Sequence, residues 1–370
     1  MKKPIRPIPK FDWFIPIDGD GSHIGTEVAE RPPTFDYLRE VVQAAERNGF
    51  YSMLIPTRFA NGLFDERAPL SETWTMVTAL AAVTSKIRFL IAVRPGFINT
   101  GLFSQMASTL SQISNGRIDL NVVPGGIKGE FEKMGENIDH DTRYERAAEF
   151  IAALRKLWES PESIDFKGEH IQLNNVHCSP GPLSDIQFYL GGASPAALKL
   201  AGSQSDIYLG WISKIDEVEK HLQRARKSFS DFGRNSSFGL RTHVIMRNVE
   251  EDAWAEASEL LSQASNSVKK QRTSLVSGTT MVGAAEQARE FEDYKVDTHL
   301  WNGISTVRVN CGSALVGNPE QIANELFLYW KLGIDEFILS GYPHLEECDR
   351  IANDLIPRVQ ELIESERKKS

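Results

Sequence analysis

The strongest constraint on the fold is a regular alternation between short apolar runs and longer amphipathic stretches. Short runs that are apolar on both faces are typical of strands buried in a parallel sheet, and a helical period follows most of them. The candidate strands are residues 11–17, 51–55, 87–93, 117–123, 186–190, 206–210, 238–246 and 334–339. The candidate helices are residues 34–48, 71–84, 103–113, 143–159, 194–201, 214–232, 250–263, 319–332 and 345–364.

Eight strands that alternate with helices predict an α/β fold of the closed (β/α)8 type, a TIM barrel with insertion segments. An open doubly wound sheet is the alternative. It is disfavoured by the turn after the first strand, GDGSHIG, in which Gly19, Gly21 and Gly25 miss the spacing of the dinucleotide-binding motif by one residue. We therefore predict a single barrel domain over residues 1–370, a length that such barrels reach with insertions.

Two long connections interrupt the alternation. Residues 57–70, TRFANGLFDERAPL, follow the second strand, and residues 265–299 lie between the seventh and eighth strands. Connections of this length inside a compact barrel usually serve a function. We interpret residues 57–70 as an insertion and residues 265–299 as a candidate mobile lid, with a solvated excursion that has no role as the alternative.

Composition limits the classes of partner. The formal net charge of −9 argues against a general nucleic-acid or membrane-surface binder, although local arginines can still attract an anion. The three cysteines, Cys178, Cys311 and Cys348, lie far apart and form no CxxC pair, which argues against a disulfide framework and a zinc site. No apolar run approaches membrane-spanning length. We expect a cytoplasmic protein with no metal, nucleic acid or membrane as a partner.

Polar residues that can carry chemistry gather near the ends of the last strands. Arg241 and His243 lie two residues apart on the seventh strand, so their side chains point to the same face of the sheet. Two such groups on a buried strand are costly unless they meet an anion or a partner. Trp211 ends the preceding strand, at the rim where barrels carry their active sites.

The eighth strand leads into SGYPHLEE, which places Tyr342 and His344 at the same rim, and Arg308 lies upstream in TVRVNCGSALVG. The planar fork of arginine fits the oxyanions of an acidic group. Taken singly, a strand histidine is more often a core residue and an arginine an ion-pair partner. Taken together, they predict a small anionic substrate bound near this rim. The predicted substrate-binding set is Trp211, Arg241, His243, Arg308, Tyr342 and His344.

A metal-dependent hydrolase barrel is a different interpretation of the histidines. Its ligands would be drawn from His140, Asp141, His170, His177 and His243. Neither HxH nor HExxH spacing occurs, and two of these histidines fall in a loop-like stretch, so the sequence disfavours a metal site.

Several long segments resemble the two-component alkanesulfonate monooxygenases of the bacterial luciferase superfamily, over nearly the whole chain. The matching segments are FDWFIPIDGDGSHIGTE, YSMLIPT, TLSQISNGRIDLNVV, HDTRYERAAEF, FYLGGAS, GLRTHVIMR, HLWNGISTVRVNCGSALVGNP and FILSGYPHLEE. The last three are characteristic of the sulfonate branch of this family.

The resemblance implies a (β/α)8 barrel that receives reduced FMN (FMNH2) from a separate NAD(P)H-dependent flavin reductase. With O2 it would cleave the carbon–sulfur bond of an organosulfonate and release sulfite and a carbonyl product. It also implies a homo-oligomer, either a dimer or a tetramer. The six residues of the substrate-binding set would lie at the active site, where Arg241, His243, Arg308 and Tyr342 would have catalytic roles. Asn121 would flank the flavin ring, and Tyr144, Gly192 and Ser194 would lie near the flavin phosphate.

Some positions depart from the family pattern. A longer segment replaces the cysteine that usually follows LIPT, Pro124 and Gly125 stand in place of Thr-Gly, and Asp18 stands where relatives tend to have histidine. The departures leave the exact substrate open, with a sugar sulfonate such as sulfoquinovose or a dialkyl sulfone as alternatives. Two further alternatives on the same fold are a deazaflavin-dependent oxidoreductase and a non-catalytic flavin-binding protein.

Overall fold

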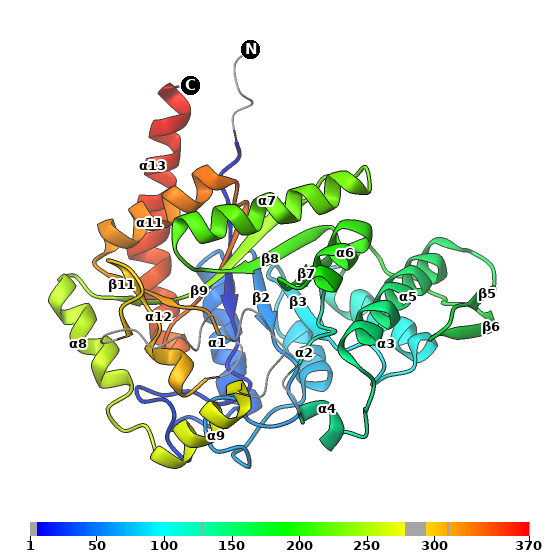
Figure 1. Cartoon of the computed structure of the whole chain (residues 1–370), viewed down its shortest axis with the longest axis horizontal. Coiled ribbons are helices and arrows are strands. Elements are labelled where there is room, and N and C mark those ends of the chain that lie inside the picture. The colour runs from blue at the N-terminus through cyan, green and yellow to red at the C-terminus, as the bar shows by residue number, and fades with distance from the viewer. Residues whose placement is uncertain (1–5, 127–128, 278–293, 309–310, 370) are drawn as a thin grey trace.

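The computed structural model describes residues 6–126, 129–277, 294–308 and 311–369, and it contains the predicted barrel (Figure 1). Parallel strands pair in sequence order, and the sheet closes because β9 pairs with β8 on one side and with β12 on the other, while β12 pairs with β1. The closed (β/α)8 fold is confirmed and the open doubly wound alternative is wrong. The barrel strands are β1 (Lys10–Phe14), β2 (Ser52–Ile55), β3 (Arg88–Val93), β4 (Ile118–Val122), β7 (Phe188–Gly191), β8 (Ile207–Trp211), β9 (Ser237–Met246) and β12 (Glu336–Ser340).

Helices surround the barrel at the predicted ranges. Local signals fix their ends: α11 begins with a capping box between Asn318 and Gln321, has Pro319 in its first turn, and ends at Gly333 in the left-handed conformation. The helices are α1 (Phe35–Arg47), α2 (Thr73–Ala82), α3 (Thr100–Ser114), α5 (His140–Glu159), α6 (Pro195–Gln204), α7 (Ile215–Asp231), α8 (Glu250–Leu260), α11 (Pro319–Leu332), α12 (His344–Arg350), the π-helical turn η3 (Ile351–Leu355) and α13 (Ile356–Lys369).

Several short elements were not predicted. A hairpin outside the barrel is formed by β5 (Ile164–Lys167) and β6 (Gln172–Val176). Strand β11 (Ala314–Gly317) pairs in parallel with the second half of β9, beyond the point where β8 ends, and in antiparallel fashion with β10 (Leu300–Trp301). The others are α4 (Glu130–Lys133), α9 (Asn266–Ser277) and the 3₁₀ turn η2 (Gly303–Thr306).

The insertion at residues 57–70 is packed rather than solvated. Leu63 and Phe64 are fully buried. The Asn61 side chain organises the segment, because its amide donates to the Asp18 and Pro69 carbonyl oxygens at 2.7 and 2.9 Å and its oxygen accepts from the backbone N–H groups of Leu63 and Phe64.

The first part of the predicted lid is helical. Residues 266–277 form α9, which lies at the lower edge of the molecule in Figure 1. The buried Arg272 side chain anchors this helix by donating to the carbonyl oxygens of Val307 at 3.1 Å and Asn61 at 3.2 Å, and to that of Phe64. Residues 278–293 lie outside the described residues, so the mobile lid stays a prediction.

Alternation along the strands divides the core into two layers. On β1, Phe11 and Trp13 point toward the helices, whereas Asp12 and Phe14 point into the barrel. An apolar cluster crosses the middle of the barrel interior and separates polar groups at its two ends. Its members are Phe14, Leu54, Leu90, Tyr189, Ile207 and Ile338.

In the described part of the chain, every helix is too short or too polar to cross a membrane.

The end of the barrel where the strands begin is acidic. Asp12 and Glu336 are buried there, and the Tyr189 hydroxyl donates to both Glu336 carboxylate oxygens at 3.0 and 3.2 Å. Neither carboxylate oxygen of Asp12 has a hydrogen-bond partner among the described residues. Burial, and then the neighbouring Glu336 carboxylate, raise the pKa of Asp12 well above its ordinary value.

We expect Asp12→Asn to raise the melting temperature more at pH 8 than at pH 5. A carboxyl whose pKa is raised by folding stabilises the native state while it is protonated. This contribution is lost, by about 1.4 kcal/mol for each pH unit, as the pH rises from the unfolded pKa to the native one. Thermal melts of the variant and the wild type at both pH values provide the measurement. Asp252→Asn, at an exposed position of α8, is the control. Equal shifts at both pH values for Asp12→Asn would contradict the assignment.

Candidate active site

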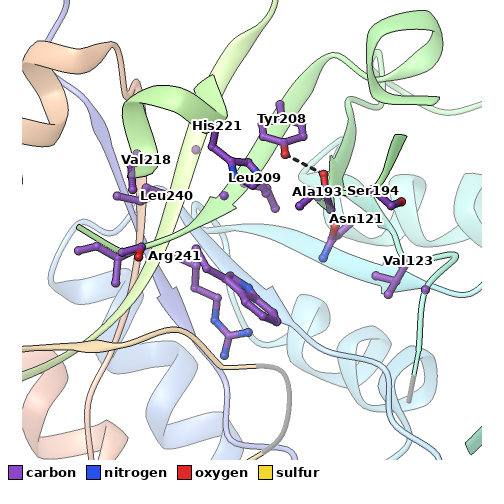
Figure 2. Close-up of a pocket in the computed structure, with 18 of the residues that line it drawn as sticks. Asn121, Val123, Ala193, Ser194, Tyr208, Leu209, Val218, His221, Leu240 and Arg241 are labelled. Atoms are coloured by element: carbon purple, nitrogen blue, oxygen red, sulfur yellow. Dashed lines mark hydrogen bonds between the residues drawn. The ribbon is translucent and has the colours of Figure 1, made fainter. Parts of the chain in front are cut away.

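A cavity of about 530 Å³ opens at the C-terminal ends of the barrel strands. Asn121 on β4, Trp211 on β8 and Arg241 on β9 contribute to its wall, as does Ser194 in the loop after β7. Figure 2 shows Asn121 and Ser194 on one side of the cavity and Arg241 on the other. This rim is where TIM barrels carry their active sites, and the volume suits a small organic ligand.

One end of the cavity surrounds the first turn of α6. Ser194 is the N-cap residue, and its hydroxyl accepts a hydrogen bond from the backbone N–H of Ala197 at 3.2 Å. Gly192 has φ 128°, and a Cβ atom there would lie 2.8 Å from the Ala197 Cβ and 3.4 Å from the Tyr144 hydroxyl oxygen. The Tyr208 hydroxyl donates to the Gly192 carbonyl at 2.7 Å (Figure 2). The absence of a side chain at Gly192 leaves the start of the helix open to an anionic group.

The four residues predicted to hold the flavin lie around this end. Burial raises the pKa of the Tyr144 hydroxyl, and its hydrogen bond with Ser194 opposes that shift only in part, so the hydroxyl stays protonated and able to donate. The cavity wall includes all four of Asn121, Tyr144, Gly192 and Ser194.

The opposite end is basic: Arg241 lines the cavity there, and the buried Arg308, which is not part of the wall, packs against the same aromatic ring. The guanidinium carbon of Arg241 lies 4.3 Å from the centroid of the Phe14 ring, and that of Arg308 lies 5.0 Å from the same centroid. In both arginines Nε and Nη2 are buried without a hydrogen-bond partner among the described residues. Burial, and then the charges of Arg308 and Arg58, lower the pKa of Arg241 to about 9. Crowded cations of this kind are costly unless an anion joins them.

Behind the arginines lie Tyr342 and His243. Arg308 Nη1 donates to the Tyr342 hydroxyl oxygen, and the rings of His243 and Tyr342 stack with centroids 5.6 Å apart at 15°. His243 Nδ1 lies 2.7 Å from the Ser340 hydroxyl, whereas Nε2 has no partner among the described residues. Burial, followed by the charges of Arg308 and Arg241, lowers the pKa of His243 well below its ordinary value. The imidazole is therefore neutral near pH 7.

The residues predicted to bind substrate fall into two groups. Trp211 and Arg241 line the cavity. The other four are buried and are not part of its wall: His243, Arg308, Tyr342 and His344.

His344 is fully buried and does not line the cavity. Its Nδ1 is 3.1 Å from Asp20 Oδ1, and its backbone N–H donates to Asp20 Oδ2 at 2.7 Å. Although burial alone would raise it, the pKa of Asp20 is lowered by the His344 charge and by hydrogen bonds from His344 and Tyr37. The His344 ring meets the Tyr342 ring at 90° with centroids 4.9 Å apart. This geometry suits a residue that positions Tyr342.

Three arginines of the cavity wall were not predicted: Arg58, Arg94 and Arg224, which lies on α7 and donates to the Ala193 carbonyl at 2.9 Å. Arg94 directly follows β3 and pairs with Glu130 at 3.1 Å, while Arg58 lies at the start of the insertion and pairs with Asp18 at 3.0 Å. The strand-end position of Arg94 is a signal that sequence reasoning offers. Arg58 carries no such signal, because its place depends on how the insertion folds back.

The histidines of the metal-dependent alternative are dispersed. His140 contacts Asp141 at 2.7 Å, His170 lies 3.6 Å from Glu145, and His243 is inside the barrel. Among the described residues no group of three or more histidine, cysteine or acidic side chains is placed to hold a metal ion.

Comparisons with known proteins agree with the fold. A family model described as luciferase-like monooxygenase matches residues 9–336. A riboflavin lyase solved with modified FMN and riboflavin is 19% identical, with a TM-score of 0.77 over 96% of this chain and 92% of that one. A long-chain alkane monooxygenase is 17% identical, with the same TM-score and the same coverage of both chains. An F420-dependent secondary alcohol dehydrogenase is 17% identical, with a TM-score of 0.67 over 95% of this chain and 99% of that one.

We expect Arg241→Met to melt at the same temperature as the wild type or higher, in buffer free of multivalent anions. Removing a buried, unpaired charge relieves repulsion, and hydrophobic replacement of buried charges is often neutral or stabilising. We also expect added sulfate to raise the melting temperature of the wild type in a saturable way, and to raise that of Arg241→Met less. The matched control is Arg88→Met, which breaks an ion pair with Asp119 at 2.8 Å and should lower the melting temperature. A destabilised Arg241→Met with an undiminished response to sulfate would show that this guanidinium has a structural role.

Proposed function

The chain belongs to the luciferase-like monooxygenase family, and from this premise we propose that it is a reduced-flavin-dependent monooxygenase that cleaves the carbon–sulfur bond of an organosulfonate. The products would be sulfite and a carbonyl compound. The observation that carries the substrate class is the pair of buried guanidinium groups of Arg241 and Arg308, which lack carboxylate partners among the described residues. Sulfonate oxygens accept the charge-assisted hydrogen bonds that such groups donate.

The cavity has the chemistry that reduced FMN requires. The open start of α6 with Ser194, and the protonated Tyr144 hydroxyl, would hold the phosphate, and the Asn121 side chain would flank the ring. When bound, reduced FMN supplies the two electrons with which O2 is split, so that one oxygen atom enters the substrate and the other leaves as water. A separate NAD(P)H-dependent flavin reductase is the proposed source of the reduced flavin.

The protein's own groups would bind the anion and manage protons. Arg241 and Arg308 would hold the sulfonate, and Trp211 on the cavity wall would exclude water. Burial raises the pKa of Tyr342 to about 12 against the opposing Arg308 charge, so its hydroxyl accepts from Arg308 and keeps its own proton to donate. The unpartnered Nε2 of the neutral His243 would accept a hydrogen bond and so help to orient a bound group.

The alternatives make different demands on the site. A sugar sulfonate such as sulfoquinovose uses the same arginines, whereas a dialkyl sulfone carries no charge and leaves them unexplained. A deazaflavin-dependent oxidoreductase is the second candidate, because an F420-dependent alcohol dehydrogenase shares the fold. A non-catalytic flavin-binding protein would not need unpaired arginines beside its cavity.

A single assay separates these functions. The protein is incubated with FMN, a flavin reductase, NADH and a panel of sulfonates and sulfones, and sulfite release and O2 consumption are measured. We expect sulfite to appear only with a sulfonate and only while O2 is consumed. Turnover of a reduced deazaflavin without O2 consumption, and no sulfite from any sulfonate, would overturn the proposal.

We expect Arg308→Ala to lower kcat/KM for sulfonate cleavage about ten- to a hundredfold. Charge-assisted hydrogen bonds contribute about 1.5–3 kcal/mol each, and about 1.4 kcal/mol corresponds to a factor of ten. Arg308→Lys should recover only part of the activity, because lysine keeps the charge but loses the planar fork. Sulfite release per folded molecule, with melting curves of the same variants, is the measurement. Normal turnover by both Arg241→Ala and Arg308→Ala would refute the anion clamp.

A further inference from the structure

The basic end of the cavity contains a third guanidinium group, contributed by the insertion. Arg58 lines the cavity with Arg241, and its side chain is only 6% exposed. Its Nε lies 3.0 Å from Asp18 Oδ2, and the Asp18 side chain is 2% exposed. The positive charge of Arg58 acts on Arg241 strongly enough to help depress the pKa of that group. Arg58 and Arg241 therefore belong to one electrostatic cluster.

The fold of the insertion holds Arg58 at this place. A Cβ atom at Gly62 would lie 2.5 Å from Arg58 Nη1, so the guanidinium group in its present place packs directly against this glycine. The buried Phe64 and the hydrogen-bonded Asn61 side chain fix the rest of the segment. The insertion thus places the guanidinium group of Arg58 in the cavity wall.

Asp18 is the shared counter-ion of this cluster. Its carboxylate forms no aligned hydrogen bond with any described residue, although Arg58 Nε lies at ion-pair distance. Burial lowers the pKa of Arg272 to about 10 and the Asp18 charge opposes this. At Arg308 the effect of burial is outweighed by Tyr342 and Asp18, and the pKa is raised. The single negative charge of Asp18 therefore acts on three guanidinium groups, those of Arg58, Arg272 and Arg308.

The charges at this end do not balance. Arg272 is left out of this count, because its donors bond to the backbone carbonyl groups of Val307, Asn61 and Phe64 and its charge is also opposed by the Asp65 and Glu66 carboxylates. The three remaining arginines, Arg58, Arg241 and Arg308, face one carboxylate, which leaves two positive charges without a counter-charge among the described residues. A ligand with a single negative charge would neutralise only one of them.

We propose that the site takes a substrate with two acidic groups, a sulfonate and a second anionic group such as a carboxylate, and that Arg58 binds the second group. The proposal rests on the proposed function for the sulfonate, which Arg241 and Arg308 hold. Asp18 orients Arg58 and tunes the net charge. The insertion at residues 57–70 is then a specificity element of the cavity.

The test is calorimetric binding to the flavin-free protein, with three ligands of similar length. Propane-1-sulfonate has one charge, 3-sulfopropanoate has a sulfonate and a carboxylate, and succinate has two carboxylates. We expect 3-sulfopropanoate to bind about ten- to a hundredfold more tightly than propane-1-sulfonate, since it gains charge-assisted hydrogen bonds. Arg58→Gln should remove most of this preference, because it should lower the affinity for 3-sulfopropanoate by a much larger factor than the affinity for propane-1-sulfonate.

Two further variants make the result specific. Arg67→Gln, at an exposed position of the same insertion, removes the same charge and should keep the preference for two charges. Arg58→Lys keeps the charge and loses the fork, so it should keep part of the preference. If melting curves show that Arg58→Gln does not fold, Arg58→Lys replaces it in the test of the preference for two charges.

The outcomes distinguish this proposal from the proposed function. Equal affinities for the two sulfonates, or an Arg58→Gln variant that binds both more weakly by the same factor, would overturn the two-charge site while sulfite release remained. If reduced FMN makes propane-1-sulfonate bind as tightly as 3-sulfopropanoate, the flavin supplies the second charge and the proposal is also overturned. Succinate that binds as tightly as 3-sulfopropanoate would support the two charges and count against a sulfonate substrate.

Discussion

Buried positive charge that the carboxylates of the described residues neutralise only in part is the constraint on which the rest of this structure depends. Arg241 and Arg308 lie within 5.0 Å of the centroid of one aromatic ring, that of Phe14, which offers cation–π attraction but no neutralising charge. The folded state bears this cost because the large apolar layer between the strands and the helices supplies the stability. An anion removes the cost, so that ligand binding and relief of repulsion are the same event.

The barrel keeps this charge from finding an internal partner. Along each strand every second side chain points inward, which stacks an acidic end, an apolar middle and a basic end inside one closed sheet. The acidic groups, Asp12 and Glu336, lie beyond the apolar cluster from the basic end, and the nearer carboxylates are engaged: Asp20 pairs with His344. Among the carboxylates that the structure describes, Asp18 is the one that pairs with an arginine of this cluster, Arg58. The strand arrangement therefore keeps the acidic and basic groups apart, and an anionic ligand would supply the missing negative charge.

Apolar periodicity was enough to predict the barrel strands and the surrounding helices, because burial on two faces leaves a pattern that is local in sequence. The short strands β10 and β11 carry no such pattern, since their pairing with β9 depends on contacts across the fold. Arg241 was predicted from its strand position and lines the cavity, whereas the part of Arg58 depends on a loop that folds back onto Asp18. His344 was predicted at the rim from its place after the last strand, but its ring turns toward Asp20. Spacing along a strand predicts which face a side chain takes, but beyond the end of the strand, as at His344, it predicts only the position of the residue.

The measurement that tests the central claim most directly is a crystal structure of the protein with 3-bromopropane-1-sulfonate, in which anomalous scattering locates the bromine. The account predicts the sulfonate oxygens within hydrogen-bond distance of the guanidinium groups of Arg241 and Arg308, and the bromine in the cavity. A sulfonate bound elsewhere, with both guanidinium groups paired to protein carboxylates, would contradict it.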